Sequence, residues 1–243
     1  MVFVGNDVVD LANPRTEGRG SDDRFIARVF DDTEQEAIRA EGGSDVELWS
    51  RWAAKEAAFK AISKVIGVPP AFLHRTFRVE WSNSRGGDTA QDDPEEALVR
   101  EGSVRHGDHV AEVTVRLRPG AVHAVAVCAL HGTPAAPTVR RRVARLVDPK
   151  SPWSGPLEEL LHRFSQREAD AVRSVESAAV RLAAREDVAR LLGVAEKRVE
   201  IVCDPGQASR RPPRIIVDGS PAFADISLSH DGGWIAWAIW VGT

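Results

Sequence analysis

The sequence contains little cysteine, little lysine and no long apolar run, and these shortages exclude several classes of protein. No apolar stretch reaches the length that a membrane-spanning helix needs. The N-terminus lacks the basic start and long apolar core of a signal peptide, so we expect a cytoplasmic protein. The formal net charge of -4 argues against a nucleic-acid partner, because binding to a phosphate backbone requires a basic face.

The two cysteines, Cys128 and Cys203, each lie in a strand-like run. This position predicts buried free thiols in place of a disulfide or a metal site. Only five residues are lysine, and three of them, at positions 55, 60 and 64, are concentrated in one segment. With 243 residues, 43% of them hydrophobic, the chain is long enough for one large domain or two small ones.

The segment from about Val46 to Ile66 is predicted to be a helix that ends at Gly67. Its apolar residues form one stripe that should face the core, and Lys55 falls inside that stripe. Glu56 and Lys60 lie one turn apart beside its edge, where a carboxylate and an ammonium could face a cleft. The alternative is a buried amphipathic helix with one snorkelling lysine and one surface ion pair.

A Val-rich strand interrupted by Gly5-Asn6-Asp7 is predicted at Val2 to Leu11. If that strand is buried, the Asp7 carboxylate requires a metal, a cation or backbone donors as partners. Alternatively, Asn6-Asp7 forms a turn that Asp7 caps.

Other patterns predict an α+β fold. Capping and glycine signals indicate short helices at Asp22 to Phe30 and from Thr33 to about Gly42. Period-two alternation or continuous apolar runs indicate four further strands, at Phe77 to Trp81, Val110 to Leu117, Val122 to Leu130 and Trp234 to Val241.

An internal repeat suggests two lobes. Residues 181–190, RLAAREDVAR, resemble residues 51–60, RWAAKEAAFK, and each copy is followed by a closing apolar strand. We therefore expect two similar lobes, residues 1–131 and 139–243, joined by a linker at 132–138. Each lobe should be a small antiparallel sheet packed on helices, and the two should be related by a pseudo-twofold axis.

The stretch around His230 is the second candidate for a site. Ile226 and Leu228 alternate with Ser227 and Ser229, a pattern that indicates a strand delivering His230 to a Gly-Gly turn. There the imidazole and nearby N–H groups could meet a phosphate, although a structural histidine would give the same pattern. Arg210, Arg211 and Arg214, set around Pro212, add three cations that could hold phosphate or form ordinary surface.

Three stretches together resemble the signatures of the 4'-phosphopantetheinyl transferase superfamily: GNDVVDL at residues 5–11, WAAKEAAFK at residues 52–60 and SLSHD at residues 227–231. Their order is similar to that of small holo-acyl-carrier-protein synthases. The length and repeat look instead like the larger, pseudodimeric members, in which the Ser-His strand usually precedes the acidic motifs. Here that order is reversed.

The resemblance implies a role for each matching residue. Asp7 and Glu56 would hold Mg²⁺ against the pyrophosphate of coenzyme A, and Lys60 would neutralise phosphate charge. Lys55 belongs to the same helical motif and would join the coenzyme A contacts. Ser229 and His230 would contact phosphate from the opposite lobe. Arg211 and Pro212 would line the nucleotide pocket.

The implied function is transfer of 4'-phosphopantetheine from coenzyme A to a serine of an acyl or peptidyl carrier protein, releasing adenosine 3',5'-bisphosphate. Asp7, Glu56 and Lys60 would carry the catalysis, with Glu56 or a metal-bound water as the base. The alternative is a non-catalytic module that binds coenzyme A or a carrier protein on the same fold. We expect a monomer with pseudodimeric lobes.

Overall fold

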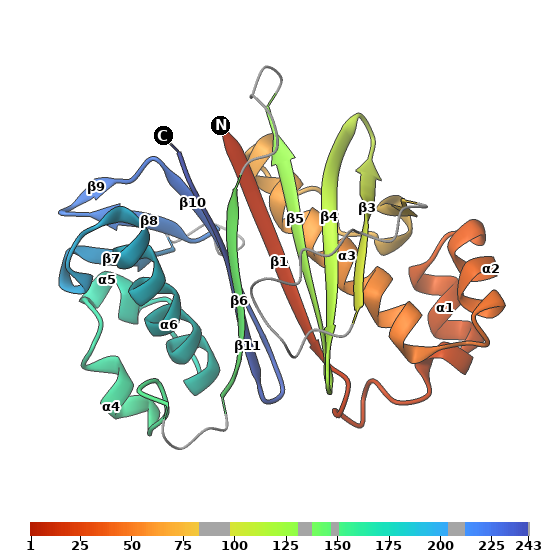
Figure 1. The fold of residues 1–243 in the computed structure, drawn as a ribbon, viewed down its shortest axis with the longest axis horizontal. Coiled ribbons are helices and arrows are strands. Elements are labelled where there is room, and N and C mark those ends of the chain that lie inside the picture. Colours follow the sequence, from red (N-terminus) through yellow and green to blue (C-terminus); the bar gives the residue numbers. More distant parts are fainter. Residues whose placement is uncertain (83–97, 131–137, 147–150, 204–211, 243) are drawn as a thin grey trace.

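The structure is a computed structural model that describes residues 1–82, 98–130, 138–146, 151–203 and 212–242. It confirms the predicted mixture of helices and antiparallel sheets (Figure 1). The predicted linker at 132–138 lies outside the described residues except for residue 138. The two-lobe boundaries and the pseudo-twofold axis therefore stay predictions.

The N-terminal half contains one five-stranded antiparallel sheet, ordered β1-β5-β4-β3-β2. Its strands are β1 (Val2–Asp10), β2 (Arg78–Trp81), β3 (Leu98–His106), β4 (His109–Arg118) and β5 (Ala121–Ala129). Its helices are η1 (Arg19–Ser21), α1 (Asp23–Val29), α2 (Asp32–Ala40), α3 (Asp45–Ile66) and η2 (His74–Thr76).

The C-terminal half contains two three-stranded sheets, ordered β10-β11-β6 and β7-β8-β9. The strands are β6 (Val139–Arg145), β7 (Val199–Val202), β8 (Arg214–Val217), β9 (Ser220–Pro221), β10 (Ala224–Asp231) and β11 (Trp234–Val241). The helices are α4 (Leu157–Leu161), α5 (Gln166–Ala169), α6 (Val175–Leu192) and η3 (Glu196–Arg198). As in the first half, the first strand pairs antiparallel with the last, β6 with β11 and β1 with β5.

Helix α3 is fixed at both ends by local signals. The Ser44 hydroxyl accepts a hydrogen bond from the Glu47 N–H, and Gly67 ends the helix with a φ of 79°. The predicted bounds are thus confirmed to within one residue. The helix packs on the sheet through Ala54, Ala58 and Ile62, all fully buried.

Strand β1 is continuous through Gly5-Asn6-Asp7, so the predicted interruption and the alternative of a capping turn there are both wrong. A Cβ on Gly5 would lie 1.9 Å from the Ala57 carbonyl oxygen of α3. Glycine therefore allows the helix to approach the strand closely, and no turn is needed.

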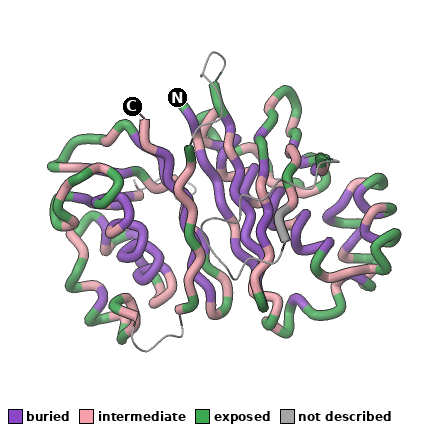
Figure 2. The backbone as a smooth tube through the Cα atoms, in the orientation of Figure 1, coloured by how far each residue is buried: buried purple, intermediate pink, exposed green. Residues whose placement is uncertain are grey.

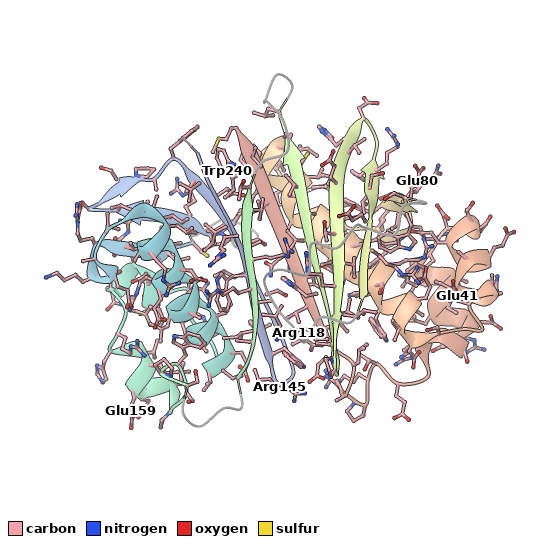
Figure 3. The ribbon with its side chains drawn as sticks, in the orientation of Figure 1. Glu41, Glu80, Arg118, Arg145, Glu159 and Trp240 are labelled. Carbon is pink, nitrogen blue, oxygen red and sulfur yellow. The ribbon has the colours of Figure 1, made fainter. Side chains whose placement is uncertain are left out.

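Strands β1 and β10 lie side by side along the centre of the molecule (Figure 1). Figure 2 shows that buried residues gather in these strands and in the long helices α3 and α6. Small apolar clusters join the two halves, among them Val4 with Trp240 and Val8 with Trp234. Trp240 is labelled near one end of this seam and Arg145 near the other (Figure 3). None of the described helices combines the length and apolar character that a membrane span requires.

Candidate active site

Strand β1 carries Asp7 into contact with residues of both halves. Asp7 Oδ1 accepts one hydrogen bond from Lys60 Nζ of α3 at 2.9 Å and another from the Ser229 hydroxyl of β10 at 2.9 Å. Lys60 Nζ also donates to the Asn6 carbonyl oxygen at 2.8 Å. Three of the residues predicted from separate motifs thus meet at one carboxylate.

Glu56 lies one turn before Lys60 on α3 and is half-buried. Its Oε1 lies 3.5 Å from His74 Nε2, and the His74 ring stacks on Trp52 with centroids 4.3 Å apart. No local sequence pattern predicts a role for His74, because none places the turn after α3 beside that helix. This contact joins the Glu56 side chain to the turn after α3.

Burial raises the pKa of the Asp7 carboxyl, and the nearby Glu56 charge raises it further. The Lys60 ammonium and the Ser229 hydroxyl act in the opposite direction. The negative charge of Glu56 therefore acts on the Asp7 carboxylate. Two such acids repel each other unless a cation lies between or beside them.

A ladder of side-chain hydrogen bonds aligns β10 with the free edge of β1. Alternate backbone N–H groups of β1 donate across the seam to side chains of β10, in the pairs Val4 with Asp225, Asn6 with Ser227, Val8 with Ser229 and Asp10 with Asp231. Each pair is separated by the same number of residues, so the strands run parallel. The ladder satisfies an otherwise open strand edge and sets the position of Ser229 relative to Asp7.

Lys64 reinforces this alignment one turn beyond Lys60. Its ammonium donates to Asp225 Oδ2 at 2.9 Å and to two carbonyl oxygens, those of Val4 at 2.8 Å and Ile226 at 2.7 Å. All three donors are therefore used, two of them across the seam. Burial lowers the pKa of Lys64, while Asp225 opposes that shift.

A pocket of about 310 Å³ opens between the halves beside these contacts. Side chains of α3, α6 and β10 and the segments near them line it: Phe59, Lys60, Ser63, Lys64, Pro69, Ser177, Val180, Arg181, Cys203, Pro212, Pro213, Ser227, Leu228 and His230. Two of the predicted binding residues, His230 and Pro212, thus share a pocket with Lys60. Arg211 lies outside the described residues.

His230 is exposed at the pocket. The partial loss of water around its ring lowers the pKa of His230, and the positive charges of Lys60 and Arg181 lower it as well. Glu176 on α6 opposes the shift. At neutral pH the ring is therefore neutral and can offer one donor and one acceptor.

The structure does not bring Lys55 to this pocket, which corrects the expectation that it contacts coenzyme A. Lys55 is fully buried, and its ammonium donates to Glu34 Oε2 at 2.6 Å and to the carbonyl oxygens of His74 and Val29. Burial lowers the pKa of Lys55 and Glu34 raises it. These partners lie outside α3, so the helical periodicity of α3 alone does not predict them.

Glu186, at the repeat position of Glu56, also differs from expectation. The spacing of Glu186 and Arg190 predicts an ion pair one turn apart on the helix, but Arg190 pairs with Asp187. Glu186 Oε1 instead accepts a hydrogen bond from Trp153 Nε1 at 2.9 Å. It therefore contacts a neighbouring segment of the same half.

The donor set fits a hard divalent cation. Asp7 and Glu56 each offer carboxylate oxygens, and Mg²⁺ prefers one or two carboxylates completed by water and phosphate oxygens. Among the described residues, no group of three or more His, Cys, Asp and Glu side chains gathers as a metal cluster. A protein-only cage is therefore not formed by the described part of the chain, and the substrate and water would have to complete the coordination.

Comparison with known proteins gives two matches. Residues 3–114 match the family model described as the 4'-phosphopantetheinyl transferase superfamily, a segment that contains Asp7, Glu56 and Lys60. A holo-[acyl-carrier-protein] synthase from Azoarcus sp. (strain BH72) is 39% identical over 71 residues. The aligned stretch covers 29% of this chain and 56% of that relative, little more than half its length. These two matches support the resemblance to the 4'-phosphopantetheinyl transferase superfamily that the three motifs predicted.

Proposed function

We propose that the protein transfers 4'-phosphopantetheine from coenzyme A to a serine of an acyl or peptidyl carrier protein, with Mg²⁺, and releases adenosine 3',5'-bisphosphate. The observation that carries the proposal is the meeting of Asp7, Lys60 and Ser229 at one carboxylate beside a pocket between the halves. A coenzyme A molecule that enters this pocket would place its diphosphate near both Lys60 and the two acids.

In the proposed reaction, the carrier serine oxygen forms a bond to the phosphorus that bears the pantetheine arm. The bond from that phosphorus to the oxygen bridging the two phosphates breaks, and the nucleotide leaves with the electron pair. Glu56, which is half-buried and lies 3.5 Å from His74, or a metal-bound water would accept the serine proton. Such a displacement depends mainly on positioning and charge neutralisation.

The residues of the site divide these tasks. Asp7 and Glu56 would hold Mg²⁺, which when bound neutralises diphosphate charge. Lys60, fixed by Asp7 and the Asn6 carbonyl, supplies a cation at the edge of the pocket. The neutral His230 offers a hydrogen bond to the nucleotide end of the ligand. We propose that the protein acts as a cytoplasmic monomer, in which the two halves of one chain would together form one site.

The test is an intact-mass assay with coenzyme A, Mg²⁺ and a panel of apo carrier proteins. The proposal expects one carrier to gain one phosphopantetheine group, and the gain to vanish when a chelator removes the metal. Calorimetric binding of coenzyme A without any mass gain across fatty-acid, polyketide and peptide carriers would favour the non-catalytic binding module. Absence of both coenzyme A binding and transfer would overturn the proposed transferase and the binding module alike.

A further inference from the structure

Helix α3 and the segment after it hold one imidazole ring in place, that of His74 in η2. The ring stacks on Trp52 with centroids 4.3 Å apart and packs on Phe72 with centroids 4.2 Å apart. Phe72 in turn packs on Phe59 of α3 at 4.4 Å. On the helix surface, Glu56 lies between Trp52 and Phe59, one turn from each. The aromatic contacts therefore restrict the ring of His74 beside the Glu56 side chain.

The backbone of His74 is fixed as well. Its carbonyl oxygen accepts a hydrogen bond from the fully buried Lys55 ammonium at 3.1 Å and another from the Phe77 N–H at 3.1 Å. Lys55 is itself held by Glu34. Because Lys55 immediately precedes Glu56, two neighbouring residues of α3 contact the same histidine, one at its backbone and one at its ring.

The ring nitrogen Nε2 of His74 lies next to Glu56. It is 3.5 Å from Glu56 Oε1 and is shielded from solvent. Within the described part of the chain, Nε2 has no closer polar partner, and His74 is the one side chain within ion-pair distance of Glu56. Lys60, one turn after Glu56, pairs with Asp7. A buried ring nitrogen requires a partner and an ionised carboxylate can only accept, so Glu56 is the acceptor for a proton on Nε2.

We propose that His74 is a positioning residue, which donates from Nε2–H to Glu56 and holds that carboxylate in the orientation that binds a divalent cation. This role rests on the proposed function in one respect, that Glu56 is a ligand of Mg²⁺. The 3.5 Å separation is longer than a normal N–H···O bond, and such contacts often tighten when the substrate binds.

A partner of this kind strengthens metal binding by orienting the ligand in advance. A glutamate side chain loses rotamer freedom when it binds a cation, and a donor that already holds it reduces that loss. Removal of a hydrogen-bonded partner of a metal ligand commonly lowers metal affinity by about tenfold to a hundredfold.

The first test measures metal affinity without turnover. Mn²⁺ replaces Mg²⁺, because the electron paramagnetic resonance signal of free Mn²⁺ reports the bound fraction, with and without coenzyme A and with no carrier protein present. His74→Phe keeps an aromatic ring but removes the donor. His106→Phe is the matched control, since the His106 ring stacks on Phe77 at 4.1 Å and its Nδ1 contacts the Thr76 hydroxyl. We expect Mn²⁺ affinity to fall about tenfold or more in His74→Phe and to stay within about twofold of wild type in His106→Phe.

A packing role for His74 would give a different result. An Mn²⁺ affinity equal to wild type in folded His74→Phe would overturn the proposed positioning, and so would an equal loss in His74→Phe and His106→Phe. Circular dichroism and thermal unfolding establish that each variant is folded.

The second test reads the ring in the wild type and does not depend on a His74 variant. NMR of protein with ¹⁵N-labelled histidine distinguishes the two ring nitrogens, and proximity to the Trp52 ring assigns His74. We expect a proton on Nε2 of His74, with a signal that shifts in Glu56→Ala while the signals of His106 stay unchanged. An unprotonated Nε2 in the wild type would overturn the proposed donation to Glu56.

These measurements separate the role of His74 from the proposed function. Weaker Mn²⁺ binding in His74→Phe, together with no transfer to any carrier by the wild type, would keep the positioning role and reject the transferase. Transfer by the wild type with unchanged Mn²⁺ affinity in His74→Phe would do the reverse. A wild type that binds no Mn²⁺ in either condition would overturn both the positioning role and the metal of the proposed function.

Discussion

The Ser229 hydroxyl donates to Asp7 Oδ1 at 2.9 Å, although 222 positions separate the two residues in the sequence. This contact is the point at which the first and last motifs of the chain meet. It depends on the ladder between β1 and β10, because a shift of either strand by one residue would turn Ser229 away from β1. The candidate site is therefore a property of the seam between the halves and not of either half alone.

Removal of either acid at the candidate metal site should abolish turnover. We expect Asp7→Ala and Glu56→Gln each to lose activity and Mg²⁺ dependence in the intact-mass assay while keeping their secondary structure by circular dichroism. Glu186→Gln is the matched control, since Glu186 occupies the repeat position on α6 and only accepts a hydrogen bond from Trp153. That variant should keep wild-type activity and lose at most about 1 kcal/mol of stability.

Near-normal, Mg²⁺-dependent activity in an Asp7 or Glu56 variant would remove that residue from the metal site. A large loss of activity in folded Glu186→Gln would show that the second helix contributes to catalysis, contrary to the arrangement of contacts described above.

The sequence predicted those features of the site that local patterns determine. The bounds of α3, the strand character of the Asp7 segment and the strand that delivers Ser229 all follow from periodicity and capping. Asp7, Glu56, Lys60 and His230 were identified because each belongs to a motif with a fixed spacing. The predicted α+β class holds for the same reason.

The residues that were missed or misplaced depend on distant partners. Lys55 was expected at the site, but its partner Glu34 comes from another helix. Lys64 was noticed only as part of a lysine cluster, since its partner Asp225 lies 161 positions away. Ion pairs between residues that are far apart in the sequence depend on how the segments pack in three dimensions. Local patterns in a single sequence do not predict this packing.

Lys55 should matter for stability and not for coenzyme A binding. Lys55→Met leaves the buried Glu34 carboxylate without its cation, and we expect a loss of about 3–5 kcal/mol. Urea denaturation monitored by tryptophan fluorescence measures this loss. Coenzyme A affinity of the remaining folded protein, measured by calorimetry at low temperature, should stay within about twofold of wild type. A stable variant with weakened coenzyme A binding would restore Lys55 to the pocket.

The Lys64–Asp225 pair should behave as a coupled unit across the seam. Asp225→Asn removes the negative partner but keeps an oxygen that can accept from the Val4 N–H, while the buried Lys64 loses its counter-charge. We expect each single variant, Lys64→Met and Asp225→Asn, to cost about 3 kcal/mol or more. The double variant should cost clearly less than the sum of the two, because no uncompensated charge remains. Strict additivity in urea denaturation would show that the two side chains do not interact.

Acid should destabilise the protein partly through His123, which lies on the face of β5 opposite α3. Burial, reinforced by the positive charges of Arg116, Arg118 and Lys60, lowers the pKa of His123 to about 3. The unfolded chain binds a proton at His123 near pH 6.5, whereas the folded protein does not until about pH 3. The contribution of the neutral His123 ring to the free energy of unfolding is therefore fully present above pH 6.5. It declines as the pH falls from 6.5 towards 3.

The size of this effect follows from the same difference in pKa. At pH 5, protonation of His123 in the unfolded chain lowers the free energy of unfolding by about 2 kcal/mol relative to its value at high pH. His123→Gln removes the titrating group, so its free energy of unfolding should fall less steeply between pH 6.5 and 5 than that of the wild type, whatever its stability at pH 7.5. Urea denaturation at half-unit pH steps measures both slopes, and the difference between them cancels the titration of groups that the two proteins share. Equal slopes would mean that His123 is protonated in the folded protein at mildly acidic pH, and its burial beside two arginines would then need a carboxylate partner.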